Sequence, residues 1–361
     1  MKRALTLLAL LVWAHPVEAQ LSERIDIEGL LYVTYLNGEV GGEERNAFSI
    51  DRAYVTTRVR VLPKLQGRVT IDTRQDLEGD GLGDMEVRLK YAYAKYTFGD
   101  AGPVRGFAVE GGIVHMVWLD FEEHMDLYRM RDPMFMERSG LFNSADIGIT
   151  FSGALGESLG EEYRDRVSSS YAARHGSFAV GVYNGGGYHA VERNQDKVVQ
   201  GRLTLRPLPE RLPGLQVSGL AILGKGNADG EAGELPDWRT YNLFASYQHA
   251  RGAVTAQYAW GEGNQRGDWT EPADATDATG FSGLSLFGEA RLAGGWRAIG
   301  GFDRFERTPG ASDRAFDRLH AGIGYDLGSQ NILILDWDRR EWDDAALDTD
   351  TRVRVVMQLK F

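Results

Sequence analysis

The chain has 361 residues, a formal net charge of −12 and no cysteine. The absence of cysteine excludes a disulfide framework, a thiol nucleophile and a thiolate metal site. The acidic balance argues against general nucleic-acid binding, which depends on a basic surface.

The N-terminus has the layout of a secretory signal. Met1-Lys2-Arg3 precedes an apolar run from Ala4 to Ala14, and small residues close the segment at Val17-Glu18-Ala19. This pattern is typical of a cleaved signal peptide, and the run is short for the alternative, a membrane anchor. We predict a signal peptide over residues 1–19 and one domain over residues 20–361. No later segment approaches the roughly 20 apolar residues of a membrane-spanning helix.

Strict alternation of apolar and polar residues recurs along the rest of the chain. At the C-terminal end, apolar residues occupy every second position from Val353 to Phe361, and Arg352, Arg354, Gln358 and Lys360 fall on the opposite face. Such segments, separated by breaks rich in Gly, Asp, Asn and Pro, predict strands with one face in lipid and one in water.

This pattern predicts about sixteen strands, an even number that suits an antiparallel barrel with both termini on one side. We place them near residues 25–36, 47–61, 66–75, 84–98, 105–114, 145–155, 177–184, 198–206, 215–224, 239–250, 253–261, 280–292, 295–306, 317–327, 331–341 and 351–361. Short turns are expected at 62–65, 251–252, 293–294 and 329–330, and long outer loops at 37–46, 76–83, 185–197, 225–238, 262–279, 307–316 and 342–350. The break at 156–176 is long where a short turn is expected.

Residues 115–144 form the longest stretch without a strand pattern, and they make up the third outer loop. Aromatic and Met side chains in a long loop require a dry place to pack, so we predict that the loop folds into the lumen and narrows it. An external loop that closes over its neighbours, or a trimer contact, is the alternative. The constriction residues that we predict are Trp118, Asp120, Glu122, Glu123, Asp126, Arg129, Arg131 and Arg138.

The inward faces of the predicted strands are rich in basic residues. These are Arg52, Arg58, Arg60, Arg68, Arg74, Arg88, Lys90, Arg202, Arg206, Arg291, Arg297, Arg318, Arg352, Arg354 and Lys360. Fewer carboxylates share those faces, among them Asp72, Glu289, Asp303, Asp326, Asp336 and Asp338. A basic lumen would favour anions. The alternative is that the arginines pair with these carboxylates and stiffen the wall.

Several stretches together resemble the phosphate-selective porin (porin O and P) family. They are Phe48-Ser49-Ile50-Asp51-Arg52-Ala53-Tyr54-Val55, Val69-Thr70-Ile71-Asp72, Trp118-Leu119-Asp120-Phe121-Glu122-Glu123, Ser144-Ala145-Asp146-Ile147-Gly148 and Val180-Gly181-Val182-Tyr183-Asn184-Gly185-Gly186-Gly187. The resemblance implies a sixteen-stranded barrel, usually trimeric, with an inward third loop and basic residues along an anion path. Phe361 resembles the terminal aromatic residue that outer-membrane barrels present to the assembly machinery. The chain has no dense lysine cluster, so phosphate is one candidate among small anionic solutes.

The sequence therefore predicts an outer-membrane porin in a Gram-negative-type bacterium, embedded in lipid, without enzymatic activity, metal or cofactor, and with no nucleic-acid partner. The alternative is a barrel with a filled lumen that serves as an enzyme or as an adhesion or structural scaffold. Seven histidines without the HExxH spacing give that alternative little chemical support.

Overall fold

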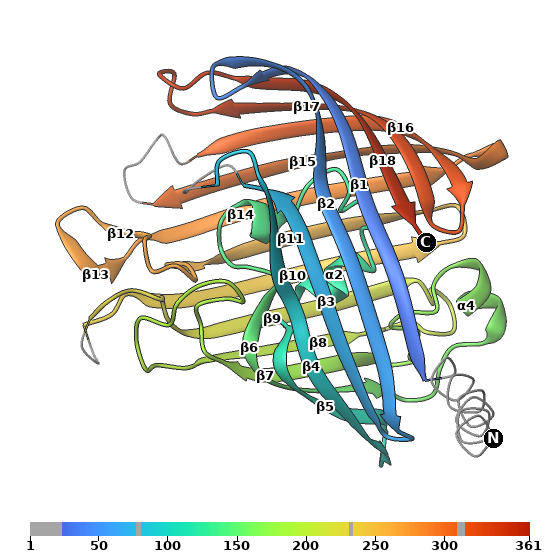
Figure 1. Ribbon diagram of the computed structural model, residues 1–361. Helices are drawn as coiled ribbons and strands as arrows, with labels where there is room; N and C mark the ends of the chain where they lie inside the picture. The colour runs from blue at the N-terminus through green and yellow to red at the C-terminus, as the bar shows by residue number, and fades with distance from the viewer. Residues whose placement is uncertain (1–23, 77–80, 231–233, 309–314) are drawn as a thin grey trace, which may run out of the picture.

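Each long strand pairs antiparallel with the long strands before and after it in the chain, and β1 pairs with β18 to close the ring (Figure 1). The structure is a computed structural model that describes residues 24–76, 81–230, 234–308 and 315–361. The predicted signal peptide lies outside the described residues. The closed all-β barrel confirms the predicted fold class.

Sixteen strands form the barrel, and their positions agree with the sequence-based prediction. They are β1 (Ile25–Val40), β2 (Glu43–Leu62), β3 (Leu65–Gln75), β4 (Met85–Ala101), β5 (Val104–His115), β6 (Ala145–Leu155), β7 (Gly176–Tyr183), β8 (Val198–Leu205), β9 (Leu215–Lys225), β10 (Asp237–His249), β11 (Gly252–Glu262), β14 (Gly280–Arg291), β15 (Trp296–Thr308), β16 (Phe316–Gly328), β17 (Asn331–Trp342) and β18 (Asp350–Lys360). A separate hairpin of β12 (Thr270–Glu271) and β13 (Asp274–Ala278) lies in the connection after β11, where we expected no strand.

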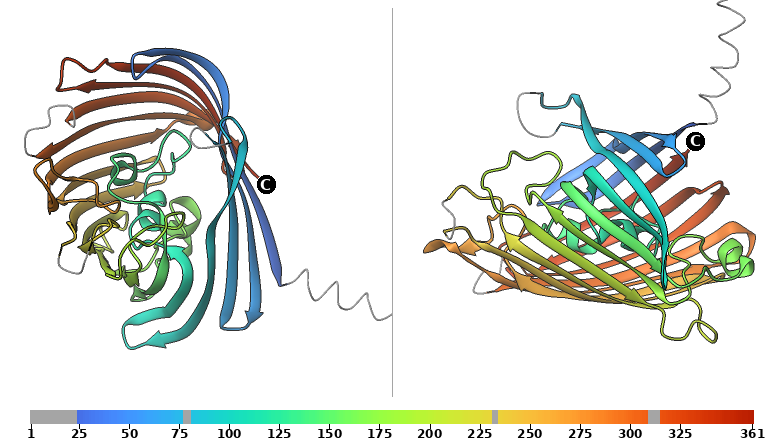
Figure 2. Two further views of the ribbon diagram at one scale, coloured as in Figure 1. Left: turned by 60° about the vertical axis from the view of Figure 1, so that its left-hand side comes forward. Right: turned by 90° about the horizontal axis from the view of Figure 1, so that it is seen from below.

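Alternation along each strand gives the wall an outer and an inner face. In β17, Leu333 and Leu335 are exposed, whereas Ile334 and Asp336 are buried. Asp336 lies directly opposite Arg354 of the neighbouring strand β18, so oppositely charged side chains lie side by side on the inner face. The wall curves round on itself in both views of Figure 2.

The inner face is not polar throughout, which corrects the expectation of a uniformly wet lumen. Leu220, Ile222, Phe244 and Phe281 on β9, β10 and β14 are buried there in one apolar cluster. Apolar side chains at inward positions need a dry partner, and the segment between β5 and β6 supplies it.

Two connections differ from the prediction. The expected long loop at 37–46 is a two-residue turn, because Gly41 and Gly42 adopt φ values of 63° and 76° that suit a tight hairpin. The break at 156–176 is indeed long and contains the short helix α4 (Glu161–Arg166). Figure 1 shows α4 at the end of the barrel where β18 ends and β12–β13 at the other.

The C-terminal residue completes the closure of the ring. The backbone N–H of Phe361 donates to Gly29 O at 3.1 Å, and the N–H of Gly29 donates to Phe361 O at 2.6 Å. The side chain of Phe361 is 82% exposed. Within the described ranges, none of the helices has the length and apolar character needed to traverse a bilayer.

Candidate functional site

The segment between β5 and β6 packs its apolar side chains against the inner face of the barrel. It contains α2 (Leu119–Glu123) and α3 (Phe135–Arg138), and Trp118 and Phe135 are buried. The ring of Trp118 lies 5.2 Å from that of Phe244 on β10. Burial of each large side chain contributes about 1.5–3 kcal/mol. These contacts hold the segment against the strands, and we call residues 116–144 the inner segment.

Glu122 is the polar anchor of α2. Its Oε2 accepts from Trp118 Nε1 at 2.7 Å, and its Oε1 accepts from Gln257 Nε2 of β11 at 2.5 Å. Burial raises the pKa of the Glu122 carboxyl to about 7, although both hydrogen bonds act in the opposite direction.

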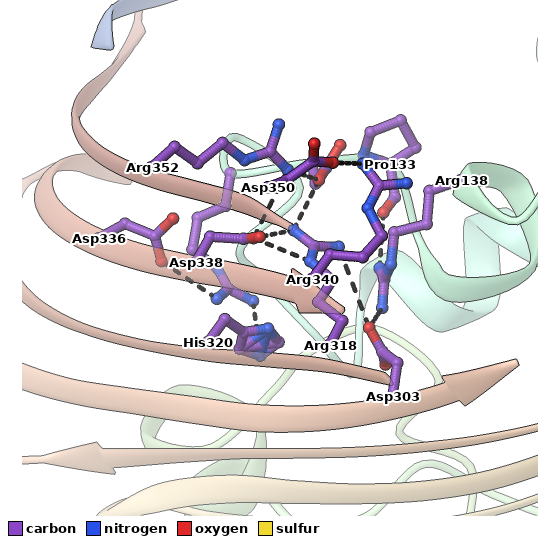
Figure 3. A network of polar contacts seen from close by, with 12 residues as sticks. Pro133, Arg138, Asp303, Arg318, His320, Asp336, Asp338, Arg340, Asp350 and Arg352 are labelled. Carbon is purple, nitrogen blue, oxygen red and sulfur yellow. Dashed lines mark hydrogen bonds and ion pairs between the residues drawn. The ribbon is translucent and has the colours of Figure 1, made fainter. Parts of the chain in front are cut away.

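An ionic network joins the inner segment to β15–β18 (Figure 3). Arg318 Nη2 lies 2.7 Å from Asp132 Oδ2 and also pairs with Asp338. Arg138 Nη2 lies 2.5 Å from Asp303 Oδ2. These charges are largely buried, and each has an opposite partner.

Further predicted lumen arginines belong to the same network or to neighbouring pairs. Arg354 pairs with Asp336, and Arg131 lies 3.5 Å from the same aspartate. Arg352 Nη2 is 3.1 Å from Asp132 Oδ2. On this side of the barrel the arginines are therefore paired, as the alternative interpretation of the sequence held.

The other predicted bases on the inner face have varied partners. Pairs with carboxylates are Arg58 with Glu28, Arg74 and Arg88 with Glu86, and Arg291 and Arg297 with Glu289. Backbone carbonyls accept from Arg202 and Arg206, and the Gln330 side chain accepts from Lys360. Arg60 is exposed at the end of β2.

Three bases on β2–β4 differ from this pattern. Among the described residues, no carboxylate oxygen lies within 4 Å of the side-chain nitrogens of Arg52, Arg68 or Lys90. They lie against tyrosines instead. Lys90 Nζ is 5.2 Å from the ring of Tyr54, and the Arg68 guanidinium is 4.6 Å above the ring of Tyr91. We call Arg52, Arg68 and Lys90 with these tyrosines the basic wall.

The inner segment presents its own charges toward the basic wall. Arg129 lies 2.8 Å from Glu123 and 2.6 Å from Glu137, so one arginine offsets part of the charge of two carboxylates. Lys90 interacts electrostatically with Arg129 and Glu137. Glu123, one of the predicted constriction acids, is thus engaged by an arginine of its own segment.

Asp120 and Asp126 complete the set of predicted constriction acids. Asp120 Oδ2 accepts from the phenol of Tyr171, at 2.5 Å. Asp126 Oδ1 accepts from the N–H of Tyr128 at 2.9 Å, and burial raises the pKa of Asp126.

Two cavities flank the inner segment. One, of about 670 Å³, lies between α2, the 156–175 connection and the wall, and it is lined by Arg68, Tyr93, Lys95, Glu110, His115 and Tyr171 among others. The other, of about 360 Å³, lies beside α3 and is lined by Arg138, Trp269, Phe316 and Arg340 among others.

Sequence reasoning did not single out the tyrosines of the basic wall. Tyr54 follows Arg52 by two positions, so the alternation that placed Arg52 inward also placed Tyr54 inward. Tyr188, whose ring lies 5.5 Å from Lys90 Nζ, belongs to a connection and carried no such signal. Within the described part of the chain, no group of three or more His, Asp or Glu side chains is placed to hold a metal ion.

The closed antiparallel barrel is a fold that this chain shares with solved outer-membrane porins. An anion-selective porin from Comamonas acidovorans superposes with a TM-score of 0.63 at 12% identity, over 93% of this chain and 99% of that one. The outer membrane channel DcaP of Acinetobacter baumannii gives 0.60 at 12% identity, over 93% and 97%. OmpF of Salmonella typhi gives 0.58 at 14% identity, over 93% and 97%. At these identities the likeness concerns the fold. No protein-family model and no curated protein matches the chain.

Proposed function

We propose that the protein is a porin of the bacterial outer membrane, through which small solutes, preferentially anions, diffuse passively between the basic wall and the inner segment. The observation that carries the proposal is the set of inward bases Arg52, Arg68 and Lys90, among them two guanidinium groups, without a carboxylate within 4 Å among the described residues. Uncompensated cations in a confined passage attract anions and repel cations.

The position of the inner segment supports the same function. Its apolar side chains pack on β7–β11 and β14–β18 and against Tyr32 of β1, and its ionic contacts reach β15–β18, whereas the basic wall lies on β2–β4. The segment would thus fill the lumen on the sides away from β2–β4 and narrow the passage along the basic wall. A scaffold or enzyme with a filled lumen would conduct no ions.

The exposed aliphatic side chains on the outer face, such as Leu333 and Leu335, suit lipid. The signal at residues 1–19 would direct export, and the exposed Phe361 would be available to the assembly machinery. A homotrimer is part of the proposal, since one solved barrel with this fold, OmpT of Vibrio cholerae, is described in a trimer form. Phosphate is one candidate solute.

The test is single-channel recording of the refolded mature protein in a planar bilayer under a KCl gradient. We expect stable steps of current and a reversal potential shifted toward the equilibrium potential of chloride. The double variant Arg52→Gln/Arg68→Gln should move that potential toward zero, because it removes the two guanidinium charges of the basic wall. Arg339→Gln is the matched control, since Arg339 is exposed on the outer face of β17 and pairs with Glu341.

The outcomes separate the parts of the proposal. Absence of conductance from correctly folded protein would overturn the channel function. Conductance that is equally selective in the double variant and in the wild type would overturn the role of the basic wall. Block of the chloride current by millimolar phosphate, lost in the double variant, would identify phosphate as a solute of this path.

A further inference from the structure

The larger of the two cavities beside the inner segment has the composition of a binding site. It lies between α2, the 156–175 connection and the inner face of β3–β8, and its volume of about 670 Å³ is in the range of small-molecule sites. Arg68 lines this cavity and is also part of the basic wall, so the cavity adjoins the proposed path of anions.

Charged side chains of both signs line this cavity, and several of them are paired with each other. Lys95 and Glu110 face each other in register on β4 and β5, and Lys95 Nζ lies 2.9 Å from Glu110 Oε1. Arg105 Nε lies 2.6 Å from Glu157 Oε1. A charged ligand would have to compete with one member of a pair for the other, which leaves a charge in the wall without its partner. The pairs therefore favour a neutral ligand.

The other charged residues of the lining are also engaged within the chain. Arg68 Nη1 lies 3.1 Å from His115 Nε2, and Asp120 Oδ1 lies 3.7 Å from the same nitrogen, so charges of opposite sign flank the imidazole. Arg202 Nη1 donates to the Ser177 hydroxyl, and its Nε donates to a backbone carbonyl, both at 3.0 Å. Opposite charges thus offset one another across the lining, although Arg68 itself has no carboxylate within 4 Å among the described residues.

The Lys95–Glu110 pair uses only part of its hydrogen-bonding capacity. Lys95 Nζ donates one hydrogen bond, to Glu110 Oε1, so within the described ranges Oε2 of the carboxylate has no donor and the ammonium keeps two further N–H groups. The hydroxyls of Ser152 and Ser158 also line the cavity, and neither has a partner in the described part of the chain. The wall therefore offers donors and acceptors side by side, and a hydroxyl is the neutral group that uses both.

Adjacent hydroxyls on a ring suit an ion pair of this geometry. One hydroxyl can donate to Glu110 Oε2 while its neighbour accepts from Lys95 Nζ, and the ion pair itself stays intact. Much of the remaining lining is apolar or aromatic and includes Tyr93, Tyr171 and Ala179. Such a surface suits the C–H faces of the same ring. A ligand with a rim of hydroxyls and two less polar faces is a saccharide.

We propose that this cavity binds neutral saccharides, and that the Lys95–Glu110 pair recognises two adjacent hydroxyls of the ligand. A sugar acid or an amino sugar is less suitable, because its charge competes with the pair. An apolar ring is less suitable, because it displaces water from the polar part of the wall and returns no hydrogen bond. The proposal goes beyond the anion path, since its ligand is uncharged and its binding does not depend on conductance.

The experiment is a titration of the refolded protein with glucose, in a detergent without a sugar headgroup, followed by isothermal calorimetry and by saturation-transfer difference NMR. Glucuronate adds a negative charge to the ring, glucosamine adds a positive charge, and cyclohexanol keeps a six-membered ring with one hydroxyl. We expect glucose to bind at least about tenfold more tightly than each of the three other probes.

Two variants and one control locate the site. Glu110→Gln leaves Lys95 without its carboxylate, so it should weaken glucose binding by about tenfold and make glucuronate the tighter ligand. The charge reversal Lys95→Glu/Glu110→Lys rebuilds the pair, because the two positions face each other in register, and it should restore the preference for glucose. Lys64→Gln is the matched control, since Lys64 donates to Phe98 O and does not line the cavity. Circular dichroism and heat-modifiable mobility would verify folding of each variant.

Each result decides the inference separately from the channel function. Binding of glucuronate, glucosamine or cyclohexanol to the wild type as tightly as glucose would overturn the saccharide site, even in a conducting protein. Loss of glucose affinity in folded Glu110→Gln without the change of preference, or equal affinity in Glu110→Gln and Lys64→Gln, would overturn recognition by the ion pair. Selective glucose binding by a protein that does not conduct would support the site and overturn the channel.

Discussion

The phenol of Tyr171 donates a 2.5 Å hydrogen bond to Asp120 Oδ2, and this bond joins the 156–175 connection to α2. Tyr171 has a φ of 50°, a conformation that costs a non-glycine residue about 1–3 kcal/mol. Its surroundings compensate: its ring lies 5.0 Å from that of Phe121, and Arg206 Nη2 donates to its carbonyl at 3.0 Å. The long connection at 156–176 thus holds the inner segment from the end that carries α4.

Replacement of Tyr171 by Phe removes this bond and keeps the ring contact with Phe121. We expect the local stability of α2 to fall by about 1 kcal/mol, because water can partly replace the donor to the half-exposed Asp120. Hydrogen–deuterium exchange of residues 118–125 should become faster. Tyr163→Phe is the control, since Tyr163 lies in the same connection and bonds Arg206 at 3.5 Å. Equal exchange in both variants would contradict the role of Tyr171.

The attachment of α2 should depend on pH through Glu122. Its pKa is about 7 in the folded protein against an ordinary value of 4.5. Because the folded pKa is raised, the segment is most stable below pH 4.5, loses stability as pH rises to 7, and is constant above that. The total effect is on the order of 3 kcal/mol. Amide exchange of α2, measured from pH 5 to 8 and corrected for intrinsic chemistry, should accelerate up to about pH 7 and then level off.

Glu122→Gln should abolish that pH dependence. The glutamine can still accept from Trp118, and its N–H can donate to Gln257 Oε1 once that amide turns over, since Oε1 has no partner among the described residues. Exchange rates of α2 that rise with pH equally in the variant, after correction for intrinsic chemistry, would show that another group titrates.

The positions of the strands could be predicted because the sequence repeats with a period of two wherever one face is buried. The hairpin of β1 and β2 shows the limit. Residues 37–46 are polar, so they indicated a loop, yet Asn37 and Asn46 pair across the two strands. Strands whose side chains are polar on both faces keep their backbone hydrogen bonds but have no apolar face to reveal them.

The turn of this hairpin gives a test of its geometry. Gly41 has a φ of 63°, which asparagine adopts readily and a β-branched residue does not. Gly41→Asn should leave the unfolding midpoint in urea almost unchanged. Gly41→Val should lower the unfolding free energy by about 1–2 kcal/mol. Equal stability of the two variants would show that the turn does not require a positive φ at position 41.

The sequence placed the candidate bases on the inner face but could not tell which of them are paired. Alternation fixes the face, whereas pairing depends on residues far apart in the chain. Asp132 accepts from Arg318 and Arg352, which follow it by 186 and 220 positions. For the same reason the sequence did not reveal why the inner face of β9–β16 is apolar. Its residues were assigned to strands, but the inner segment that they contact could not be identified as their partner.

Removal of a carboxylate from the paired side of the barrel should shift the reversal potential in the direction opposite to removal of bases from the basic wall. Asp338 accepts from Arg318 Nε at 2.8 Å and lies 3.5 Å from Arg354 Nη2. Asp338→Asn leaves these buried arginines with less opposing charge, so we expect a loss of about 3–5 kcal/mol in unfolding free energy. The reversal potential should shift further toward anions, because the variant adds net positive charge to the lumen. Asp317→Asn, on the exposed side of β16, should do neither. An Asp338→Asn barrel as stable and as selective as the wild type would mean that these ion pairs neither hold the inner segment nor contribute to the field in the passage.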